Sequence, residues 1–444
     1  GQQTFDAYGN VTLATGAGGR CREVSYPEPY AQLPSTETVY AGTIGAQGCG
    51  SVALRTSVDS YDRGKGLIEA VSDLHNEKTR VQYDGFGRLT ALYKPHPERV
   101  GEHSPLPAVE VEYFLTTNAK AKPYSLMHTR VQDGELLTDG SYRDAWAYVD
   151  GMGRTIVTLD EADPDAGDGG QWVVNGLTDY DAKGATRRAY LAWFWNGDAQ
   201  SFPLSTVAAT QYTRTRYDAF GRALQTFGLD GKISLQTVYH PLSADAWDAE
   251  DLGRGPHAGT FASTAKDGHG RTVSVTERVH AGSGLEVRET QTEYLPTGEP
   301  TVIRRVRGSD SVVRWMRYDT LGRRVLNVEP NASANFTATP PADVSTIKAW
   351  RYAYDDAGQL VGTSDARSCG TNYFYDAAGR LTGEDYSPCM QHQEPYSPVL
   401  DEENGAGMEV FHQFDTVDSE ASAVRSANPD CQLNPALYLG RLAS

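Results

Sequence analysis

The side chains that could catalyse a reaction or bind a ligand are spaced in ways that favour a structural role over a catalytic one. One Gly-rich stretch carries four acidic ligands of the kind that Ca²⁺ prefers, at Asp160, Asp163, Asp165 and Asp168. Their spacing differs from that of an EF-hand, so we interpret the stretch as a solvated acidic loop. The ten histidines show no metal-site spacing, and no nucleophile elbow stands out. We therefore expect no catalytic, cofactor-binding or metal-binding residues.

Two other local clusters could bind a ligand. Trp193, Phe194 and Trp195, with Tyr190 close by, could form an aromatic platform for a sugar, but packing in a β-strand explains them at least as well. The glycine-rich segment 16–20 lacks the lysine and the strand–helix setting of a phosphate-binding loop, and it predicts a turn.

Composition narrows the class of protein further. The chain has 444 residues, a net charge of −18 and a mean hydropathy of −0.50. The acidic balance argues against a nucleic-acid partner and an anionic membrane surface. No apolar run is long enough to span a bilayer. Short alternating segments such as 109–113 and 272–276 predict a mostly β protein.

A six-residue pattern, aromatic–Asp–x–x–Gly–Arg, recurs along the chain. Looser copies lie at 5–10, 149–154, 180–185, 266–271, 294–299 and 354–359. The repeat glycines lie 24 residues apart from Gly298 to Gly322 and 21 apart from Gly358 to Gly379. A unit of that length holds two strands and two turns, which predicts one hairpin per repeat. The four strict copies are Tyr83, Asp84, Gly87 and Arg88; Tyr217, Asp218, Gly221 and Arg222; Tyr318, Asp319, Gly322 and Arg323; and Tyr375, Asp376, Gly379 and Arg380.

Each residue type in the pattern has an expected physical role. Glycine can take the positive φ that a tight turn needs. Aspartate can accept hydrogen bonds from the backbone N–H groups of the turn. Tyrosine ends the incoming strand, and its ring is expected to stack on the equivalent ring of the next repeat. Arginine opens the outgoing strand and is expected to reach a neighbouring aspartate.

These units resemble the YD repeats of RHS-type proteins, which include the B and C components of bacterial Tc toxins, RHS polymorphic toxins and teneurins. Residues 5–12 (FDAYGNVT) and 217–239 are similar to longer units of that family, and the likeness covers about 1–390. The resemblance implies an all-β fold, in which a ribbon of β-hairpins spirals into a partial hollow shell. Such a shell encloses a toxic polypeptide or caps a cell-surface protein.

The sequence departs from complete members of that family. They carry a self-cleaving aspartyl protease with a DPxGL-like junction, and the only Asp-Pro here, Asp163-Pro164, lies in the acidic loop. No protease residue can be carried over, and the β-propeller of Tc toxin B components has no counterpart. We therefore do not expect this chain to cleave itself.

Cysteine usage leaves two alternatives open. No CxxC pair or Cys/His grid exists, so a structural zinc site is not expected. Cys369 and Cys389 lie about one repeat apart, on either side of an expected turn, and would form a disulfide in an oxidising compartment. The odd total favours free buried thiols. The other three cysteines are Cys21, Cys49 and Cys431.

Two regions are expected: a YD/RHS-repeat shell over 1–390 and a loop-rich continuation over 391–444, cut before the next repeat. Residues 438–444 resemble 66–72, which lead into a repeat. Predicted loops interrupt the pattern at 95–108, 160–171, 240–260, 329–346, 387–407 and 415–435, with one short helical turn near Ala244 to Asp251.

The leading hypothesis is a non-catalytic shell segment of a large secreted or cell-surface protein that encapsulates a toxin-like cargo. Its partners would be the remaining repeats of the same polypeptide and an enclosed cargo, without nucleic acid, membrane insertion or cofactor. The alternative is an adhesin of the teneurin kind that binds a receptor or glycan. An enzyme ranks lowest.

Overall fold

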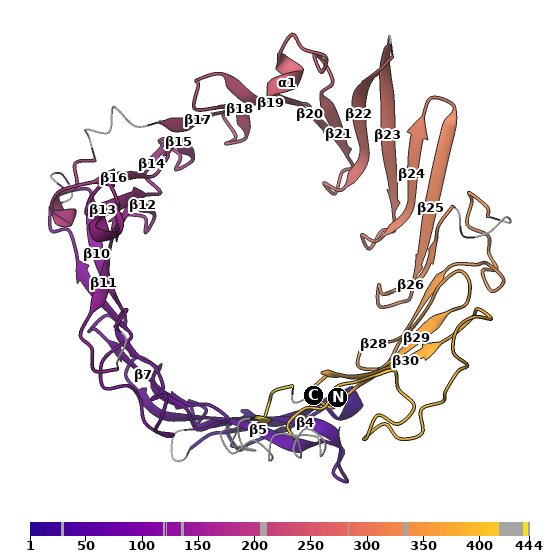
Figure 1. The fold of residues 1–444 in the computed structure, drawn as a ribbon, viewed down its shortest axis with the longest axis horizontal. Helices are drawn as coiled ribbons and strands as arrows, with labels where there is room; N and C mark the ends of the chain where they lie inside the picture. The colour runs from indigo at the N-terminus through magenta and orange to yellow at the C-terminus, as the bar shows by residue number, and fades with distance from the viewer. Residues whose placement is uncertain are drawn as a thin grey trace. The chain divides into compact units, whose positions relative to one another are not determined.

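The computed structural model describes residues 1–27, 31–118, 120, 122–134, 137–204, 211–282, 284–330, 332, 336–416 and 438–442. Its strands belong to two large antiparallel sheets of 14 and 17 strands. Within the described residues, the only α-helix is the four-residue α1 (Ala249–Leu252). The predicted all-β fold of consecutive hairpins is confirmed (Figure 1). No helix in the described part of the chain has the length and apolar character to cross a membrane.

The chain divides into two compact units. The first contains 1–105 together with 315–444, and the second contains 106–314. The expected boundary near residue 390 lies inside the first unit.

In the first unit, neighbouring strands of each segment pair in chain order. Trp315, Leu326 and Val328 are among the buried apolar side chains of its second segment. Strands of the first segment are β1 (Gln2–Phe5), β2 (Val11–Thr15), β3 (Cys21–Ser25), β4 (Thr36–Ile44), β5 (Gly50–Asp62), β6 (Leu67–Ser72), β7 (Lys78–Tyr83) and β8 (Leu89–Tyr93). Those of the second are β25 (Asp310–Tyr318), which begins in the other unit, β26 (Arg324–Val328), β27 (Trp350–Tyr354), β28 (Leu360–Ser364), β29 (Gly370–Tyr375), β30 (Leu381–Ser387) and β31 (Val410–Phe411).

The second unit contains one ladder from β9 to β13 that ends on β16, and another that runs from β14 and β15 to β17 and on to β24. The first ladder is β9 (Val109–Phe114), β10 (Tyr124–Gln132), β11 (Tyr142–Asp150), β12 (Thr155–Glu161), β13 (Trp172–Asn175) and β16 (Trp193–Trp195). The second is β14 (Thr178–Tyr180), β15 (Thr186–Tyr190), β17 (Tyr212–Tyr217), β18 (Ala223–Phe227), β19 (Ile233–Tyr239), β20 (Ser243–Asp248), β21 (Ala262–Lys266), β22 (Thr272–Ala281), β23 (Gly284–Tyr294) and β24 (Pro300–Arg307).

The second unit has a compact apolar core around Tyr148. The Tyr148 hydroxyl donates to the Ala199 carbonyl at 2.7 Å and accepts from the Phe202 N–H at 2.9 Å. Burial raises the pKa of Tyr148 to about 12. Trp193 and Trp195 pack against this core, as the strand interpretation predicted, whereas Phe194 is 46% exposed.

Where the structure describes the predicted loops, they agree with it apart from one segment, and residues 331, 333–335 and 417–435 of those loops lie outside the described residues. The segment predicted to hold a helical turn near Ala244 to Asp251 begins as strand β20 and turns helical only at Ala249. These residues form a strand and not a helical turn because residues 243–246 pair with β21. Asp248 then caps the helix by accepting from the N–H groups of Glu250 and Asp251, each at 2.8 Å. The glycine-rich segment at 16–20 forms a short 3₁₀ turn, as predicted.

Candidate functional site

An aspartate organises the repeat turns, except at 294–299, where Leu295 occupies its position. Between β7 and β8, Asp84 Oδ1 accepts from the N–H of Phe86 at 2.8 Å and of Arg88 at 3.0 Å. Its Oδ2 accepts from Arg88 Nε at 2.7 Å. The Gly87 N–H donates to the Asp84 carbonyl at 3.1 Å, and Gly87 has φ +80°. One carboxylate thus fixes both the backbone of the turn and the side chain that follows it.

The other strict copies have the same geometry. The Arg Nε to Asp Oδ2 distance is 2.7 Å in each, and the glycines have φ between +77° and +82°. Positive φ is strained for any residue with a Cβ, which explains glycine at this position. The atoms concerned are those of Arg222 and Asp218, Arg323 and Asp319, and Arg380 and Asp376, with Gly221, Gly322 and Gly379.

These hydrogen bonds favour the charged carboxylate. In the looser copy at 149–154, the Arg154 side chain and backbone donate to Asp150 and lower its pKa, outweighing partial desolvation. At Asp84, desolvation raises the pKa, but the hydrogen bonds from Arg88 and Phe86 outweigh it and the net shift is downward. The pKa values of Asp218, Asp267 and Asp319 are lowered by the same balance.

The arginine of one repeat also contacts the tyrosine of the next repeat. The Tyr294 hydroxyl donates to the carbonyl of Thr272, the residue after Arg271, at 2.7 Å. Arg271 Nη1 donates to the carbonyl of Leu295, the residue after Tyr294, at 2.8 Å. The guanidinium lies 5.0 Å from the centre of the Tyr294 ring. We call this reciprocal arrangement the inter-repeat clasp.

The clasp recurs in both units. In the first, Tyr354 donates to Arg324 O at 3.0 Å and Arg323 Nη1 donates to Asp355 O at 3.1 Å. In the second, Arg154 lies over the Tyr180 ring at 4.2 Å, and Tyr180 donates to Thr155 O at 3.1 Å. The predicted partner of the tyrosine ring was another tyrosine; the structure instead places the preceding arginine there.

Where the arginine is replaced, the tyrosine half of the clasp persists. Ala185 and Gln359 occupy the arginine position of their repeats. Tyr217 still donates to Thr186 O at 2.8 Å, and Tyr375 donates to Leu360 O at 2.9 Å. The tyrosine hydroxyl is therefore the constant part of the link between repeats.

Sequence reasoning missed one turn because its two halves are far apart in the chain. Phe414 bridges to Leu442, as Tyr83 pairs with Leu89 in a contiguous turn. The Asp415 N–H donates to the Arg441 carbonyl at 3.1 Å, and Asp415 Oδ1 accepts from the Gly440 N–H at 2.7 Å. Gly440 has φ +77°. We call this arrangement the split turn.

The split turn gives the C-terminal residues a structural role: Gly440 and Arg441 complete the turn that Phe414 and Asp415 begin. Arg380 of the preceding repeat lies over the Phe414 ring at 4.4 Å and donates to both Asp415 oxygens, at 2.6 and 3.1 Å. The residues between 416 and 438 lie outside the described part of the chain. A search for an aromatic–Asp pair followed at any distance by Gly–Arg would have found the turn.

In the first unit, the turn at 375–380 joins segments from both halves of the chain. The Ala377 N–H donates to the Gly42 carbonyl at 2.8 Å, and the Gly42 N–H donates to Asp376 Oδ2 at 3.2 Å. A Cβ at Gly50 would lie 2.8 Å from that of Ala377, so the close approach requires a glycine. Strands β4 and β5 therefore lie beside the C-terminal strands (Figure 1).

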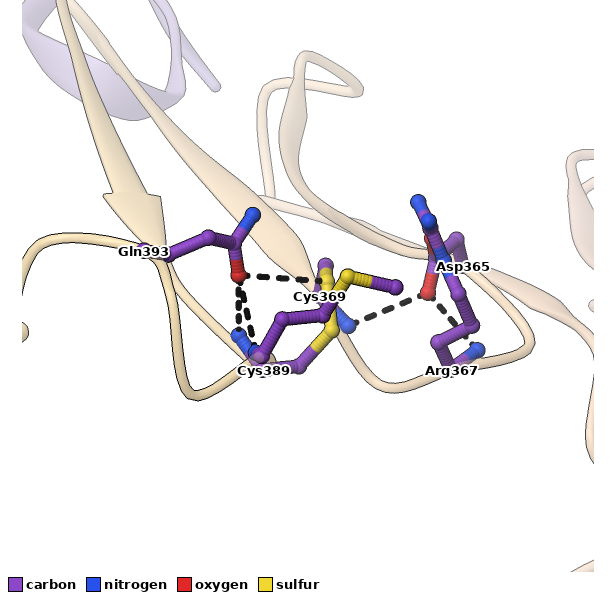
Figure 2. Close-up of a disulfide and its surroundings, with 6 residues drawn as sticks. Asp365, Arg367, Cys369, Cys389 and Gln393 are labelled. Atoms are coloured by element: carbon purple, nitrogen blue, oxygen red, sulfur yellow. Dashed lines mark hydrogen bonds and ion pairs between the residues drawn. A yellow bond between two sulfur atoms is a disulfide. The ribbon is translucent and has the colours of Figure 1, made fainter.

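Four of the cysteines form disulfides, Cys21 with Cys49 and Cys369 with Cys389. The preference for free thiols is wrong for these four, and Cys431 lies outside the described residues. Near the second disulfide, Gln393 Oε1 accepts from the Cys389 N–H at 2.8 Å and Asp365 Oδ1 accepts from the Cys369 N–H at 3.0 Å (Figure 2). These bonds hold both cysteine backbones in position.

The remaining candidate ligand-binding residues make hydrogen bonds within the chain or are joined in a disulfide. Asp163 in the acidic loop caps a 3₁₀ turn, and its own N–H donates to Asp168 Oδ2 at 2.8 Å. The one group of metal-binding type in the described chain is Asp365 with Cys369 and Cys389. Because the two sulfurs are bonded to each other, they offer no thiolate to a metal.

These features define an antiparallel β-ribbon built from repeated, clasped hairpins. No protein-family model and no curated protein matches the chain. Solved Tc toxin structures are similar in fold. The TcdB2–TccC3–Cdc42 crystal structure gives a TM-score of 0.50 at 14% identity over 87% of this chain, and TcdB2–TccC3 gives 0.46 at 16% over 88%. A mutant Photorhabdus luminescens Tc holotoxin pore gives 0.47 at 13% over 98%.

The chain spans 28%, 27% and 30% of the length of those three chains. At these identities the likeness concerns the fold alone. It places the chain with the β-sheet shells of Tc toxins in architecture.

We expect the repeat glycine to be required for its φ and not for space. A Cβ would meet open space at both Gly151 and Gly153, but only Gly153 has positive φ, at +79°. Gly153→Ala should lower the free energy of unfolding by about 1–2 kcal/mol, and Gly221→Val by more. Gly151→Ala is the matched control and should change it by less than about 0.5 kcal/mol. Equal effects in a denaturant titration would refute the turn geometry.

Acid should weaken the turns. Because the folded state lowers the pKa of Asp150, its charged form adds stability that is present above the ordinary value of 3.8 and is lost as pH falls through the lowered pKa. The difference in melting temperature between wild type and Asp150→Asn should therefore stay constant at neutral pH and shrink below about pH 4. Asp310→Asn, at the exposed start of β25, is the control. A difference that does not change with pH would contradict this.

The clasp should show energetic coupling. In a double-mutant cycle of Arg271→Gln and Tyr294→Leu, we expect a coupling of about 1 kcal/mol in the free energy of unfolding, since the guanidinium contacts the Tyr294 ring and each side chain donates to a backbone carbonyl beside the other. Pairing Arg271→Gln with Tyr217→Leu, from a different link, should give additive effects within about 0.5 kcal/mol. Additivity in the first cycle would show that the clasp contacts are independent.

Proposed function

We propose that this chain is a non-catalytic wall segment of a large secreted or cell-surface RHS/YD-repeat protein, and that the wall encapsulates a toxin-like cargo. The observation that carries the proposal is the inter-repeat clasp. It joins neighbouring hairpins through a tyrosine hydroxyl and, where the arginine is present, through a guanidinium. Further hairpins can be added by the same contacts. Its partners are other repeats of the same polypeptide and the enclosed cargo.

Two further observations support this function. The fold is similar to that of Tc toxin structures. Two disulfides suit an oxidising compartment, which favours a secreted or surface protein. A long sheet with open edges invites aggregation, and closure into a shell removes that hazard.

The charged side chains of the repeat support a structural role. The aspartates and arginines of the strict copies are engaged with one another and with the turn backbone, which leaves them poorly suited to bind a substrate. The adhesin alternative would present loops to a receptor or glycan, and the aromatic residues at 193–195 were one candidate platform for it. Two of them pack against the core of the second unit, which argues against that platform.

The test is cryo-electron microscopy of the natural protein, with every polypeptide that co-purifies, combined with limited proteolysis. We expect density enclosed by a β wall and a polypeptide that resists protease until the wall is unfolded. Weakening the wall through Tyr294→Phe with Tyr354→Phe should expose that polypeptide at lower denaturant. A solvent-filled interior, or a protease-sensitive cargo in the intact wild type, would refute encapsulation.

A further inference from the structure

A groove in the second unit has a charge opposite to that of the chain. Its volume is about 670 Å³, and it lies where β15 and β17 stop pairing. Five cationic side chains line it against two carboxylates, whereas the whole chain has a net charge of −18. The charged lining residues are Lys183, Arg187, Arg188, Arg214 and Arg216, with Asp181 and Asp218.

The nearby carboxylates are already engaged. Asp218 binds Arg222 at 2.7 Å, and Asp181 Oδ1 accepts from two N–H groups of its own turn, each at 2.9 Å. Asp179, next to the groove, binds Arg187 at 2.8 Å and lies 3.8 Å from Arg188. The acidic side chains therefore leave much of the positive charge in the groove uncompensated.

Two arginines of the groove face each other across the sheet. Arg188 and Arg214 are direct cross-strand partners. Two like charges directly opposite each other destabilise a strand pair. Arg188 Nε is buried and has no hydrogen-bond partner. Arg214 lies 4.0 Å from the Phe227 ring centre, and Arg216 Nη1 reaches the amide oxygen of Gln225 at 3.5 Å. Among the described residues, no carboxylate pairs with Arg214 or Arg216.

Another cross-strand arginine pair in the same unit shows what is missing. Arg288 and Arg307 also oppose each other, on β23 and β24. There, Glu286 bridges the two, with Oε1 at 2.6 Å from Arg288 Nε and Oε2 at 2.9 Å from Arg307 Nη2. The groove has the same pair of cations without a bridging acid.

We propose that this groove binds a phosphate or sulfate group, held by Arg188, Arg214 and Arg216 in the role that Glu286 has at the other pair. A tetrahedral oxyanion presents several acceptor oxygens, which suits the fixed forks of neighbouring guanidinium groups. It would relieve the repulsion between the two arginines. The proposal is independent of the shell function.

Titration calorimetry and thermal melting with sodium phosphate and sodium sulfate test the site, with sodium chloride matched in ionic strength. We expect both oxyanions to bind wild type and raise its melting temperature beyond the chloride effect. Arg214→Gln should weaken binding at least about tenfold and, without anion, should melt no lower than wild type because repulsion is relieved. Arg307→Gln removes the same charge at the bridged pair and should bind as wild type does.

A sulfated oligosaccharide forms a second arm that separates a free ion from a group carried on a chain. Binding of either probe that Arg214→Gln abolishes supports the site and tells which source it takes. Equal binding by Arg214→Gln and wild type, or no effect of either probe beyond that of chloride, overturns the proposal. If Arg214→Gln does not fold, Arg216→Gln gives the same comparison.

Discussion

The fold depends on the carboxylate that organises the turn of each strict repeat. The aspartate accepts from two backbone N–H groups of the turn and from the arginine four residues later, so the turn and the guanidinium are held by one group. That same guanidinium contacts the tyrosine of the next hairpin where the clasp forms. Local turn geometry and the link between repeats are therefore coupled through a single ion pair, and stability is transmitted from neighbour to neighbour.

Buried charge extends this principle in the first unit. Asp376 takes part in its own turn, accepts from Gly42 of β4 and binds Arg380. Arg380 also binds Asp415 of the split turn, and the two carboxylate side chains are only 4% and 5% exposed. Burial lowers the pKa of Arg380, but its bonds to Asp415 and Asp376 outweigh this and the net shift is upward. Three segments distant in sequence thus meet at one shared charge network.

The sequence could predict contacts between residues that lie close together in the chain, but not contacts between residues that lie far apart in it. The turns were predictable because Asp84, Gly87 and Arg88 lie within five residues and each has a local role. The clasp was not, because the partner of Arg271 depends on the register of the next hairpin. The split turn and the contact of Ala377 with Gly42 join residues far apart in sequence, which a contiguous pattern does not detect. The disulfide of Cys21 with Cys49 depends on how β3 and β5 lie, which no cysteine spacing specified.

Arginines have two outcomes in this fold, which depend on whether a carboxylate lies within reach of the guanidinium. Arg88, Arg222 and the other repeat arginines lie four residues after an aspartate and become structural links. Arg216 follows Tyr212 at that spacing and lies on a strand, where the turn offers it no acid. An arginine without its turn aspartate keeps its donors available for an external anion. The arginine pair on β23 and β24 is neutralised by Glu286, whereas the pair on β15 and β17 has no such bridge.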